Sequence, residues 1–237
     1  MPGGRRVLVT RPGDAAEKTA NRLARLGHRP VALPLSRIVP LHCPVPVDAA
    51  FDAVAVTSSN AIRHADAALV RKLDRLPCLA VGDATAQAAA RAGFGQVSSA
   101  GGDMDDLAAM ASRRLPRGAR VAYLCGRVRR PQLESAFHRA GFRTTALETY
   151  DTEKVSYSTH ELEQRLGLEP IDDIMVYSVS GAEAASHLLN LADLPQIFEN
   201  TRILCISERV AKALAVPPGL SVGIADHPDE ASLLALL

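Results

Sequence analysis

The segment Phe51-Asp-Ala-Val-Ala-Val-Thr-Ser-Ser-Asn-Ala61 contains four consecutive apolar residues that lead into a polar turn. The same pattern returns in Ile171-Asp-Asp-Ile-Met-Val-Tyr-Ser-Val-Ser-Gly181. An apolar run of this length, bounded by turn residues, is typical of a strand buried on both faces, as the strands of a parallel sheet are. The Ser and Asn residues that follow are common helix N-caps, so each segment predicts a strand, a tight turn and a helix.

Apolar runs of this kind alternate with Ala- and Leu-rich helical stretches along the chain. Helical spacing of apolar residues occurs at 17–26, 61–72, 86–92 and 132–140. This alternation predicts the α/β class, with parallel sheets that are covered by helices on both faces. The predicted strands are Val7–Thr10, Val31–Leu35, Ala53–Thr57, Cys78–Gly82, Val121–Cys125, Thr144–Leu147, Ile174–Ser178 and Ile203–Ser207.

The alternation itself repeats. Leu79-Ala-Val-Gly-Asp-Ala-Thr-Ala86 resembles Leu204-Cys-Ile-Ser-Glu-Arg-Val-Ala211, and residues 6–35 resemble residues 120–149. The chain is therefore interpreted as unit A, unit B, unit A′ and unit B′, which indicates a duplicated domain and two similar lobes with a cleft between them. The pattern leaves two pairings open. Either A pairs with B and A′ with B′, or A pairs with B′ around an inserted lobe made of B and A′.

Charge and composition narrow the class of protein. The 237 residues carry a formal net charge of +1 and no long basic run, which argues against a nucleic-acid binder. No apolar stretch is long enough to cross a bilayer, and the chain runs from Met1 into a predicted strand without a signal peptide. We therefore expect a cytoplasmic protein with no membrane association. The four cysteines are far apart and form no CxxC pair, which favours reduced, buried thiols.

Several motifs of enzyme chemistry are missing from the sequence. It contains no Walker loop, no GxGxxG after a strand, no HExxH and no nucleophile elbow. The seven histidines are scattered without the spacing of metal ligands. We therefore expect no metal site and no phosphate loop.

Small polar residues gather where the predicted strands end. In an open parallel sheet, ligands bind at this carboxyl edge. Each residue alone could be an ordinary N-cap, but several helix N-termini facing one cleft can bind several anions without a large positive charge. Arginines would supplement them with two hydrogen bonds to each carboxylate. A small molecule with dispersed carboxylates or phosphates is the predicted ligand. The candidate substrate-binding residues are Thr10, Arg11, Ser58, Ser59, Asn60, Gly82, Thr85, Arg130, Ser178, Ser180 and Ser207.

At these residues the sequence resembles the uroporphyrinogen-III synthase family. The resemblance rests on short motifs in a constant order: Thr10-Arg-Pro12, Thr57-Ser-Ser-Asn-Ala61, Val81-Gly-Asp-Ala-Thr-Ala86, Gly126 with Arg130-Pro-Gln-Leu133, Glu148-Thr-Tyr150, Ser178 with Ser180, and Ile206-Ser-Glu-Arg-Val-Ala-Lys212. Val210 stands where some members have Thr, which puts a side-chain role at this position in doubt.

The resemblance implies a fold. It implies the second pairing, with two flavodoxin-like parallel-sheet lobes, one inserted in the other. Residues 1–37 and 152–237 would form lobe 1, and residues 38–151 would form lobe 2. A two-stranded β connection would join the lobes and let them move.

The resemblance also implies an activity. Hydroxymethylbilane, a linear polycarboxylate, would be cyclised to uroporphyrinogen III with loss of water and inversion of ring D through a spiro intermediate. No metal or organic cofactor is implied, and we expect a monomer that receives its substrate by transient handover from hydroxymethylbilane synthase. Tyr150, at the return crossover, becomes the candidate proton donor to the leaving hydroxyl group. The alternative is that Tyr150 only packs at the lobe junction.

Three other functions stay open from the sequence. A non-catalytic sensor that binds a tetrapyrrole or another polycarboxylate would share the two lobes and the polar turns. A periplasmic solute-binding protein is disfavoured by the missing signal peptide, and a nucleotide-dependent α/β enzyme is disfavoured by the missing phosphate loop.

Overall fold

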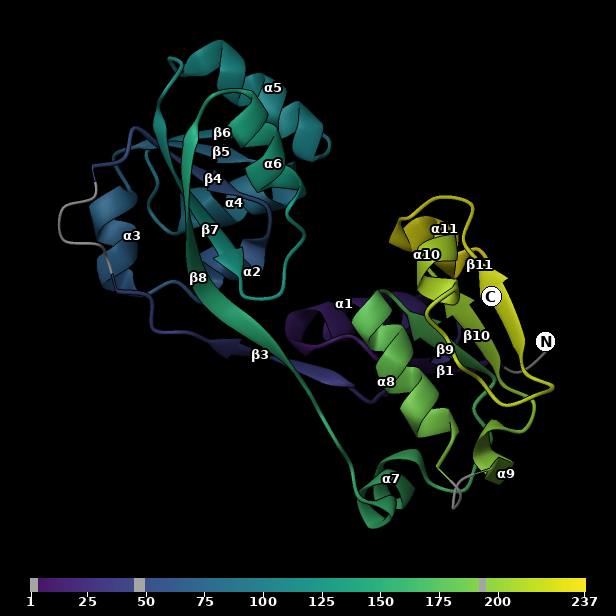
Figure 1. The fold of residues 1–237 in the computed structure, drawn as a ribbon. Coiled ribbons are helices and arrows are strands. Elements are labelled where there is room, and N and C mark those ends of the chain that lie inside the picture. The colour runs from purple at the N-terminus through teal and green to yellow at the C-terminus, as the bar shows by residue number, and fades with distance from the viewer. Residues whose placement is uncertain (1–3, 45–49, 192–194) are drawn as a thin grey trace. The chain divides into compact units, whose positions relative to one another are not determined.

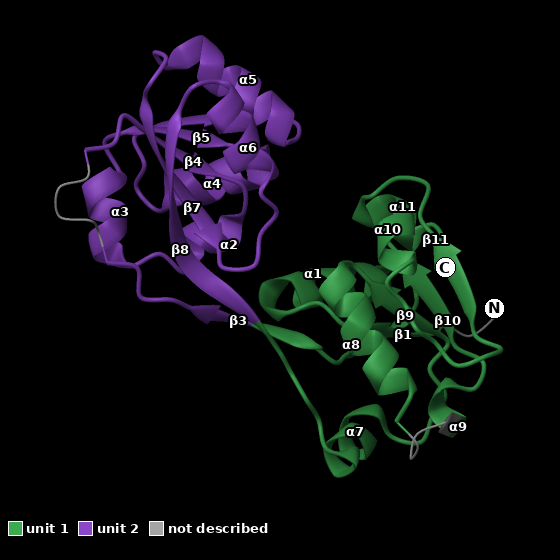
Figure 2. Ribbon diagram, viewed as in Figure 1, with its two compact units in different colours: residues 1–37, 153–237 green, residues 38–152 purple. Residues whose placement is uncertain are grey.

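The computed structural model describes residues 4–44, 50–191 and 195–237 of the chain. The chain divides into two compact units, Met1–Arg37 with Glu153–Leu237 and Ile38–Thr152, which Figure 2 shows in two colours. Each unit has its own sheet with helices on both faces (Figure 1), so the predicted α/β class is confirmed.

A five-stranded parallel sheet forms the centre of the first unit, in the order β11-β10-β9-β1-β2. Successive strand residues point to opposite faces, so Leu8 and Ile174 enter one core while Val7 and Met175 enter the other. Both faces are covered, which explains why the central strands are apolar without interruption. The strands are β1 (Arg6–Val9), β2 (Arg29–Ala32), β9 (Asp173–Val176), β10 (Arg202–Cys205) and β11 (Ser221–Ile224).

Helices supply the two outer layers of the first unit. The core that contains Leu8 is closed by four helices, and the core that contains Val7 is closed by two. The first group is α7 (Thr159–Leu166), α8 (Val179–Leu189), α9 (Pro195–Phe198) and α10 (Glu208–Ala211). The second group is α1 (Gly13–Arg25) and α11 (Glu230–Leu234).

The second unit has the strand order β3-β8-β7-β4-β5-β6, in which β4 to β8 run parallel and β3 is an additional edge strand beside β8. One core contains Ala55 and Tyr123 under α5 and α6, and the other contains Val54 and Ala122 under α2, α3 and α4. The strands are β3 (Ser36–Pro40), β4 (Ala53–Val56), β5 (Pro77–Ala80), β6 (Gln96–Ser99), β7 (Arg120–Gly126) and β8 (Arg143–Lys154). The helices are α2 (Ser59–Arg63), α3 (Ala67–Leu73), α4 (Asp83–Arg91), α5 (Met104–Arg114) and α6 (Gln132–Arg139).

The strand orders decide between the two pairings that the sequence left open. Strands β1 and β2 share a sheet with β9, β10 and β11, while β7 and β8 share a sheet with β4, β5 and β6. The spatial order of corresponding strands is the same in both sheets, but the chain enters the second sheet at a different strand. The first unit thus has the flavodoxin-like order 2-1-3-4-5, and the second unit is its circular permutation. The chain passes between the units twice, once within β3 and once within β8.

A pair of reciprocal hydrogen bonds recurs at the start of the two central strands of each unit. In the first unit, the N–H of Asp172 donates to the carbonyl of Arg6 (2.9 Å), and the N–H of Arg6 donates to the carboxylate of Asp172 (2.6 Å). In the second unit, Asp52 and Arg120 make the same two bonds, at 2.8 Å and 2.7 Å. This shared detail supports the duplication that the sequence repeat predicted.

The eight predicted strands are all present, with ends that differ by a few residues. Three strands were missed, namely β3, β6 and β11. Strands β6 and β11 lie at sheet edges with a single partner, and they contain Gln, Ser and Gly instead of an apolar run. The single helix predicted at 61–72 is wrong. It is two helices, because the backbone is extended at Asp66, whose carboxylate bonds His42 Nδ1 (3.0 Å).

The buried carboxylate of Asp173 gives the first prediction. It is fully buried and pairs with Arg5 and with Nε of Arg202 (2.8 Å). We expect Asp173→Ala to lower the free energy of unfolding by about 2–3 kcal/mol, because it removes charge-assisted hydrogen bonds and leaves two partly exposed arginines without their partner. Urea unfolding followed by circular dichroism measures this. Glu183→Ala is the control, since it breaks only an exposed pair with Lys154 and should cost less than about 1 kcal/mol. Equal losses for the two variants would contradict the assignment.

Candidate functional site

Both sheets have a switch point at which the chain connections leave in opposite directions. In the first unit, β1 connects outward to β2 on one side, and its neighbour β9 connects outward to β10 on the other. In the second unit, β7 and β4 are the corresponding neighbours. Ligands of open α/β sheets bind at the carboxyl ends of such strands. The turns that follow these four strands therefore form the candidate site in each unit.

In the first unit, the two turns at the switch point are tied to each other. The hydroxyl of Thr10 is buried and donates to the carbonyl of Met175 (2.8 Å). The guanidinium of Arg11 lies 4.3 Å from the ring centroid of Tyr177 and pairs with Glu230 (3.2 Å). Burial raises the pKa of Tyr177, so its phenol stays protonated at neutral pH. Arg11 thus already has an acidic partner, and its role in substrate binding stays a prediction.

The serines of the first unit lie at helix N-termini. Ser178 is the N-cap of α8, where its Oγ accepts the N–H of Gly181 (3.0 Å) and lies 3.2 Å from Oγ of Ser180. Ser207 precedes α10 and makes no side-chain cap bond. Val210, in that same turn, is 1% exposed and packs in the core, so its side chain has no access to a ligand.

In the second unit, the turn after β4 is capped in the same manner. Oγ of Ser58 accepts the N–H of Asn60 (3.2 Å) at the start of α2, with Ser59 between them. Just before this turn, the hydroxyl of Thr57 lies 3.0 Å from that of Tyr123, which connects the end of β4 to the middle of β7.

The neighbouring turn, after β5, contains Gly82 and Thr85. Gly82 is the N-cap of α4, and a Cβ atom added to it would meet nothing within 4 Å. The backbone there is therefore open to a ligand. Thr85 lies within α4 and is only 7% exposed, so the backbone of this turn is more accessible than the Thr85 side chain.

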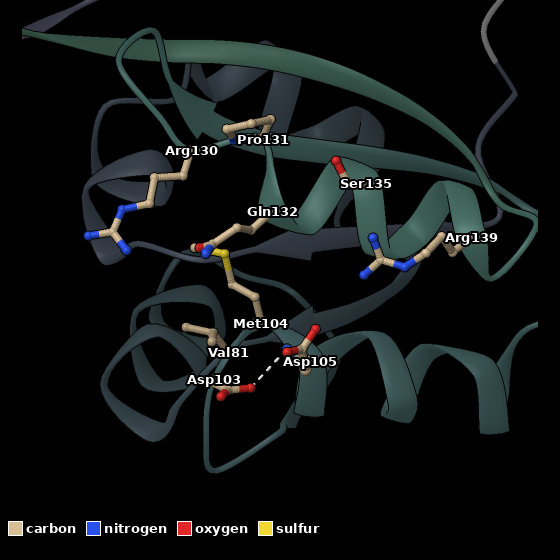
Figure 3. A pocket seen from close by; sticks show the side chains of 9 residues that line it. All are labelled: Val81, Asp103, Met104, Asp105, Arg130, Pro131, Gln132, Ser135 and Arg139. Atoms are coloured by element: carbon tan, nitrogen blue, oxygen red, sulfur yellow. Dashed lines mark hydrogen bonds between the residues drawn. The ribbon is translucent and has the colours of Figure 1, made fainter.

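A pocket of about 720 Å³ lies in the second unit at the starts of α5 and α6 (Figure 3). Its volume is within the range of roughly 300–1,000 Å³ that is usual for small-molecule sites. Arg130, four residues after the end of β7, is one of its lining residues, and its role in substrate binding stays a prediction. The sequence reasoning missed the other lining residues, although helical spacing places three of them on one face of α6. These residues are Gln132, Ser135 and Arg139 on α6, Pro131 before it, Val81 after β5, and Asp103, Met104 and Asp105 at α5.

The arginines next to Arg130 are held by acidic partners. Arg129 pairs with Glu148 (2.8 Å) and Glu134 (3.1 Å), and Arg127 pairs with Asp151 (3.1 Å). Burial acts against the charge of Arg129, but its hydrogen bonds to the two glutamates outweigh this effect and raise its pKa. The same contact with Arg129 lowers the pKa of Glu148. Arg130 has no hydrogen-bond or ion-pair partner within the described part of the chain.

Tyr150 lies in β8 opposite Gly126, at the carboxyl end of β7. The ring is partly buried, and its centroid is 6.3 Å from that of His64. Cys78, Cys125 and Cys205 are buried and Cys43 is half-buried, all four as free thiols. Burial raises the pKa of Cys78 and of Cys125 to about 12, so neither thiol acts as a nucleophile at neutral pH.

Two features are absent from the described residues. No group of three or more His, Cys, Asp or Glu side chains is arranged to hold a metal ion among them. Within the same ranges, no helix combines the length and the apolar character that crossing a bilayer requires.

Comparison with known proteins places the chain in a family. The model of the uroporphyrinogen-III synthase HemD family matches residues 17–235. The chain belongs to this family. Its members are cyclising hydro-lyases of tetrapyrrole biosynthesis, so this chain is a synthase that closes a tetrapyrrole ring, and membership implies hydroxymethylbilane as the substrate. Among curated protein sequences, none matches the chain.

Two solved structures show the same fold. The uroporphyrinogen-III synthetase of Helicobacter pylori has a TM-score of 0.68 at 18% identity, and the match covers 98% of this chain and 97% of that one. A mutant uroporphyrinogen III synthase of the extremely thermophilic bacterium Thermus thermophilus has a TM-score of 0.52 at 20% identity, with 98% and 96% covered. The synthase fold therefore extends over nearly the whole chain.

The unpartnered Arg130 gives the second prediction. We expect Arg130→Ala in this synthase to raise KM about three- to tenfold, equivalent to about 1 kcal/mol for an exposed charge contact, with kcat and stability unchanged. Steady-state kinetics and thermal unfolding measure these quantities. The matched control is Arg75→Ala, because Arg75 is exposed and lacks a described partner. It precedes β5 and so lies at the amino-terminal ends of the strands, away from the carboxyl ends that form the candidate site. A KM that stays at the wild-type value would remove Arg130 from the binding site.

Proposed function

We propose that the strand-end turns of the two units bind the carboxylates of hydroxymethylbilane and thereby decide which carbon of ring D is attacked. One observation carries this proposal: in both units, the predicted polar residues follow the strands at and beside the switch point of the sheet. Thr10, Arg11, Ser178 and Ser180 lie there in the first unit, and Ser58, Ser59 and Asn60 lie there in the second. Gly82 with Thr85, and Ser207, follow the next strand outward in each sheet.

Helix N-termini suit a ligand with many dispersed carboxylates. The first N–H groups of α4 and α8 have no partner within their helices, and the helix dipole favours a negative charge beside them. A net charge of +1 is then sufficient, because backbone groups replace most of the positive side chains. The open backbone at Gly82 and the pocket beside Arg130 support the same assignment in the second unit. Binding that is spread over so many contacts makes each single contact weak.

The reaction needs orientation more than chemical assistance. Loss of the ring A hydroxyl group as water leaves an azafulvenium cation, and the pyrrole nitrogen supplies the electron pair that drives this loss. Attack by the substituted carbon of ring D gives a spiro intermediate, which opens and closes again with ring D inverted. Correct placement can contribute roughly 7–11 kcal/mol in favourable systems, and a few kcal/mol suffice to choose between the two carbons.

The isomer of the product gives the third prediction. Hydroxymethylbilane generated in situ should be converted to uroporphyrinogen III when the chain is present, whereas without it spontaneous closure gives the symmetric type I isomer. Oxidation of the products and chromatographic separation of the two isomers measure this. Recovery of type I alone would refute the proposal. Binding of the substrate without turnover would instead support a non-catalytic sensor.

Tyr150 is the proposed proton donor to the leaving hydroxyl group. Its ring is partly buried at the carboxyl end of β7, and its centroid is 6.3 Å from that of His64, the C-cap of α2. A phenol in this position can donate its proton and form water with the departing hydroxide. No metal or organic cofactor has a role in this mechanism.

Removal of the Tyr150 hydroxyl group gives the fourth prediction. We expect Tyr150→Phe to lower kcat about tenfold or more while leaving KM and the stability nearly unchanged, because only one hydroxyl is lost. Tyr157→Phe serves as the control, since its hydroxyl donates to the carbonyl of Pro34 (2.8 Å) within the core of the first unit. A fall in kcat of less than about threefold for Tyr150→Phe would remove Tyr150 from the acid role.

We also propose that the chain acts as a monomer in the cytoplasm and takes its substrate by transient handover from hydroxymethylbilane synthase. The spontaneous closure of the substrate favours rapid capture. If handover occurs, the fraction of type I isomer will stay low even when a large excess of inactive protein is added as a diffusion trap for free substrate.

A further inference from the structure

We infer that Gly126 is a positioning residue for Tyr150, because only a residue without a side chain lets the phenol ring rest on the end of β7. The three atoms nearest to a Cβ built on Gly126 all belong to Tyr150, so the requirement arises from the ring that lies against it. The inference rests on the proposed role of Tyr150 as the proton donor.

The approach of the ring to Gly126 is very close. A Cβ atom built on Gly126 would lie 2.6 Å from Cζ, 2.9 Å from Cε2 and 3.0 Å from the hydroxyl oxygen of Tyr150. Real Cβ atoms essentially never make contacts below 3.0 Å, so any side chain at this position must displace the ring. The backbone of Gly126 does not have a positive φ, so conformational freedom is not the reason for a glycine here.

The backbone of Tyr150 is fixed, so the ring cannot escape by moving the strand. Strand β8 has a bulge at this point: Cys125 pairs with Glu148 and Gly126 with Tyr150, which leaves Thr149 as the extra residue. Thr149 is fully buried, and its hydroxyl donates to the carbonyl of Ala61 (2.8 Å). The carbonyl of Tyr150 accepts the N–H of Arg127 (2.9 Å). A side chain at Gly126 would therefore be accommodated by turning the whole Tyr150 side chain about its Cα–Cβ bond, which moves the hydroxyl.

The same contacts connect Tyr150 to the candidate site. Ala61, which accepts the hydrogen bond from Thr149, belongs to the helix that Ser58 caps. Arg129 donates to the carbonyl of Gly126 (3.3 Å), and this loop continues into Arg130 at the pocket. Strand β7 also flanks the switch point of the second unit. Gly126 thus sets the position of the phenol relative to two proposed binding elements.

Proton donation is sensitive to such a displacement. The donor must lie within about 2.6–3.2 Å of the oxygen that receives the proton, and a shift of about 1 Å can cost roughly 10²-fold in rate. A displaced Tyr150 hydroxyl would therefore slow proton donation to the leaving group and leave carboxylate binding largely intact.

A double-mutant cycle tests the inference. The wild type, Gly126→Ala, Tyr150→Phe and the double variant are compared for kcat, KM, isomer ratio and thermal unfolding. We expect Gly126→Ala to lower kcat about tenfold with KM changed less than twofold. Because Phe at 150 has no hydroxyl to misplace, adding Gly126→Ala to Tyr150→Phe should lower kcat by less than a further twofold.

Gly95→Ala is the matched control. Gly95 also has no positive φ, and a Cβ there would meet only one atom, at 4.0 Å. Its variant should keep wild-type kcat, KM and stability. A second readout is the NMR ring resonance of Tyr150 in a sample whose four tyrosines are ¹³C-labelled. This resonance is assigned as the one that disappears in Tyr150→Phe. Gly126→Ala should shift this resonance, and Gly95→Ala should not.

The outcomes are separable. If Tyr150→Phe lowers kcat by less than about threefold, the proposed acid role fails, and the inference fails with it. If Tyr150→Phe is slow but Gly126→Ala is not, only the inference fails. Two losses that multiply in the double variant would also overturn it, because Gly126 would then act independently of the hydroxyl. Failure of Gly126→Ala to fold would assign the glycine to stability instead.

Discussion

At the start of the two central strands of each unit, an aspartate and an arginine exchange hydrogen bonds between parallel neighbours. Asp172 with Arg6, and Asp52 with Arg120, fix β1 beside β9 and β7 beside β4. The positions of the turns at the carboxyl ends of these strands depend on this pairing, because the pairing places the two strands side by side at the switch point. It also explains how residues that are more than 160 positions apart, such as Thr10 and Ser178, come to follow adjacent strands.

The arginines near the candidate site fall into two groups with different tasks. Arg11 and Arg129 each have an acidic side chain beside them, so they stabilise the turns and contribute little free positive charge. Arg130 has no described partner and lies at a pocket, where it can meet an anion from solution. In the proposed binding mode, backbone N–H groups at the helix starts supply most of the attraction for a polyanion. This division is consistent with the nearly neutral composition of the chain.

The sequence was most informative where burial was complete. Strands β1, β4, β7 and β9 are buried on both faces, so their apolar runs predicted them without knowledge of their partners. The edge strands β6 and β11 have one partner each and contain half-exposed or exposed residues, so no apolar pattern marked them. Arg130 was predicted as a supplementary arginine and from the motif Gly126 with Arg130-Pro-Gln-Leu133. By contrast, Arg139 and Gln132 line the pocket because α5 packs on α6. The contact of the Tyr150 ring with Gly126 depends on the bulge in β8. Neither feature has a local signal in the sequence.

The discontinuity of the first unit has a consequence for how the chain folds during synthesis. Strands β1 and β2 leave the ribosome first, yet their sheet lacks its third strand until Asp173–Val176 has emerged. The second unit is continuous, so it can fold completely while the amino-terminal strands still wait for their neighbour. Once folded, the second unit shortens the flexible chain between β2 and β9. This lowers the conformational entropy that the chain loses when β1 pairs with β9. The inserted unit thus assists the assembly of the unit that surrounds it.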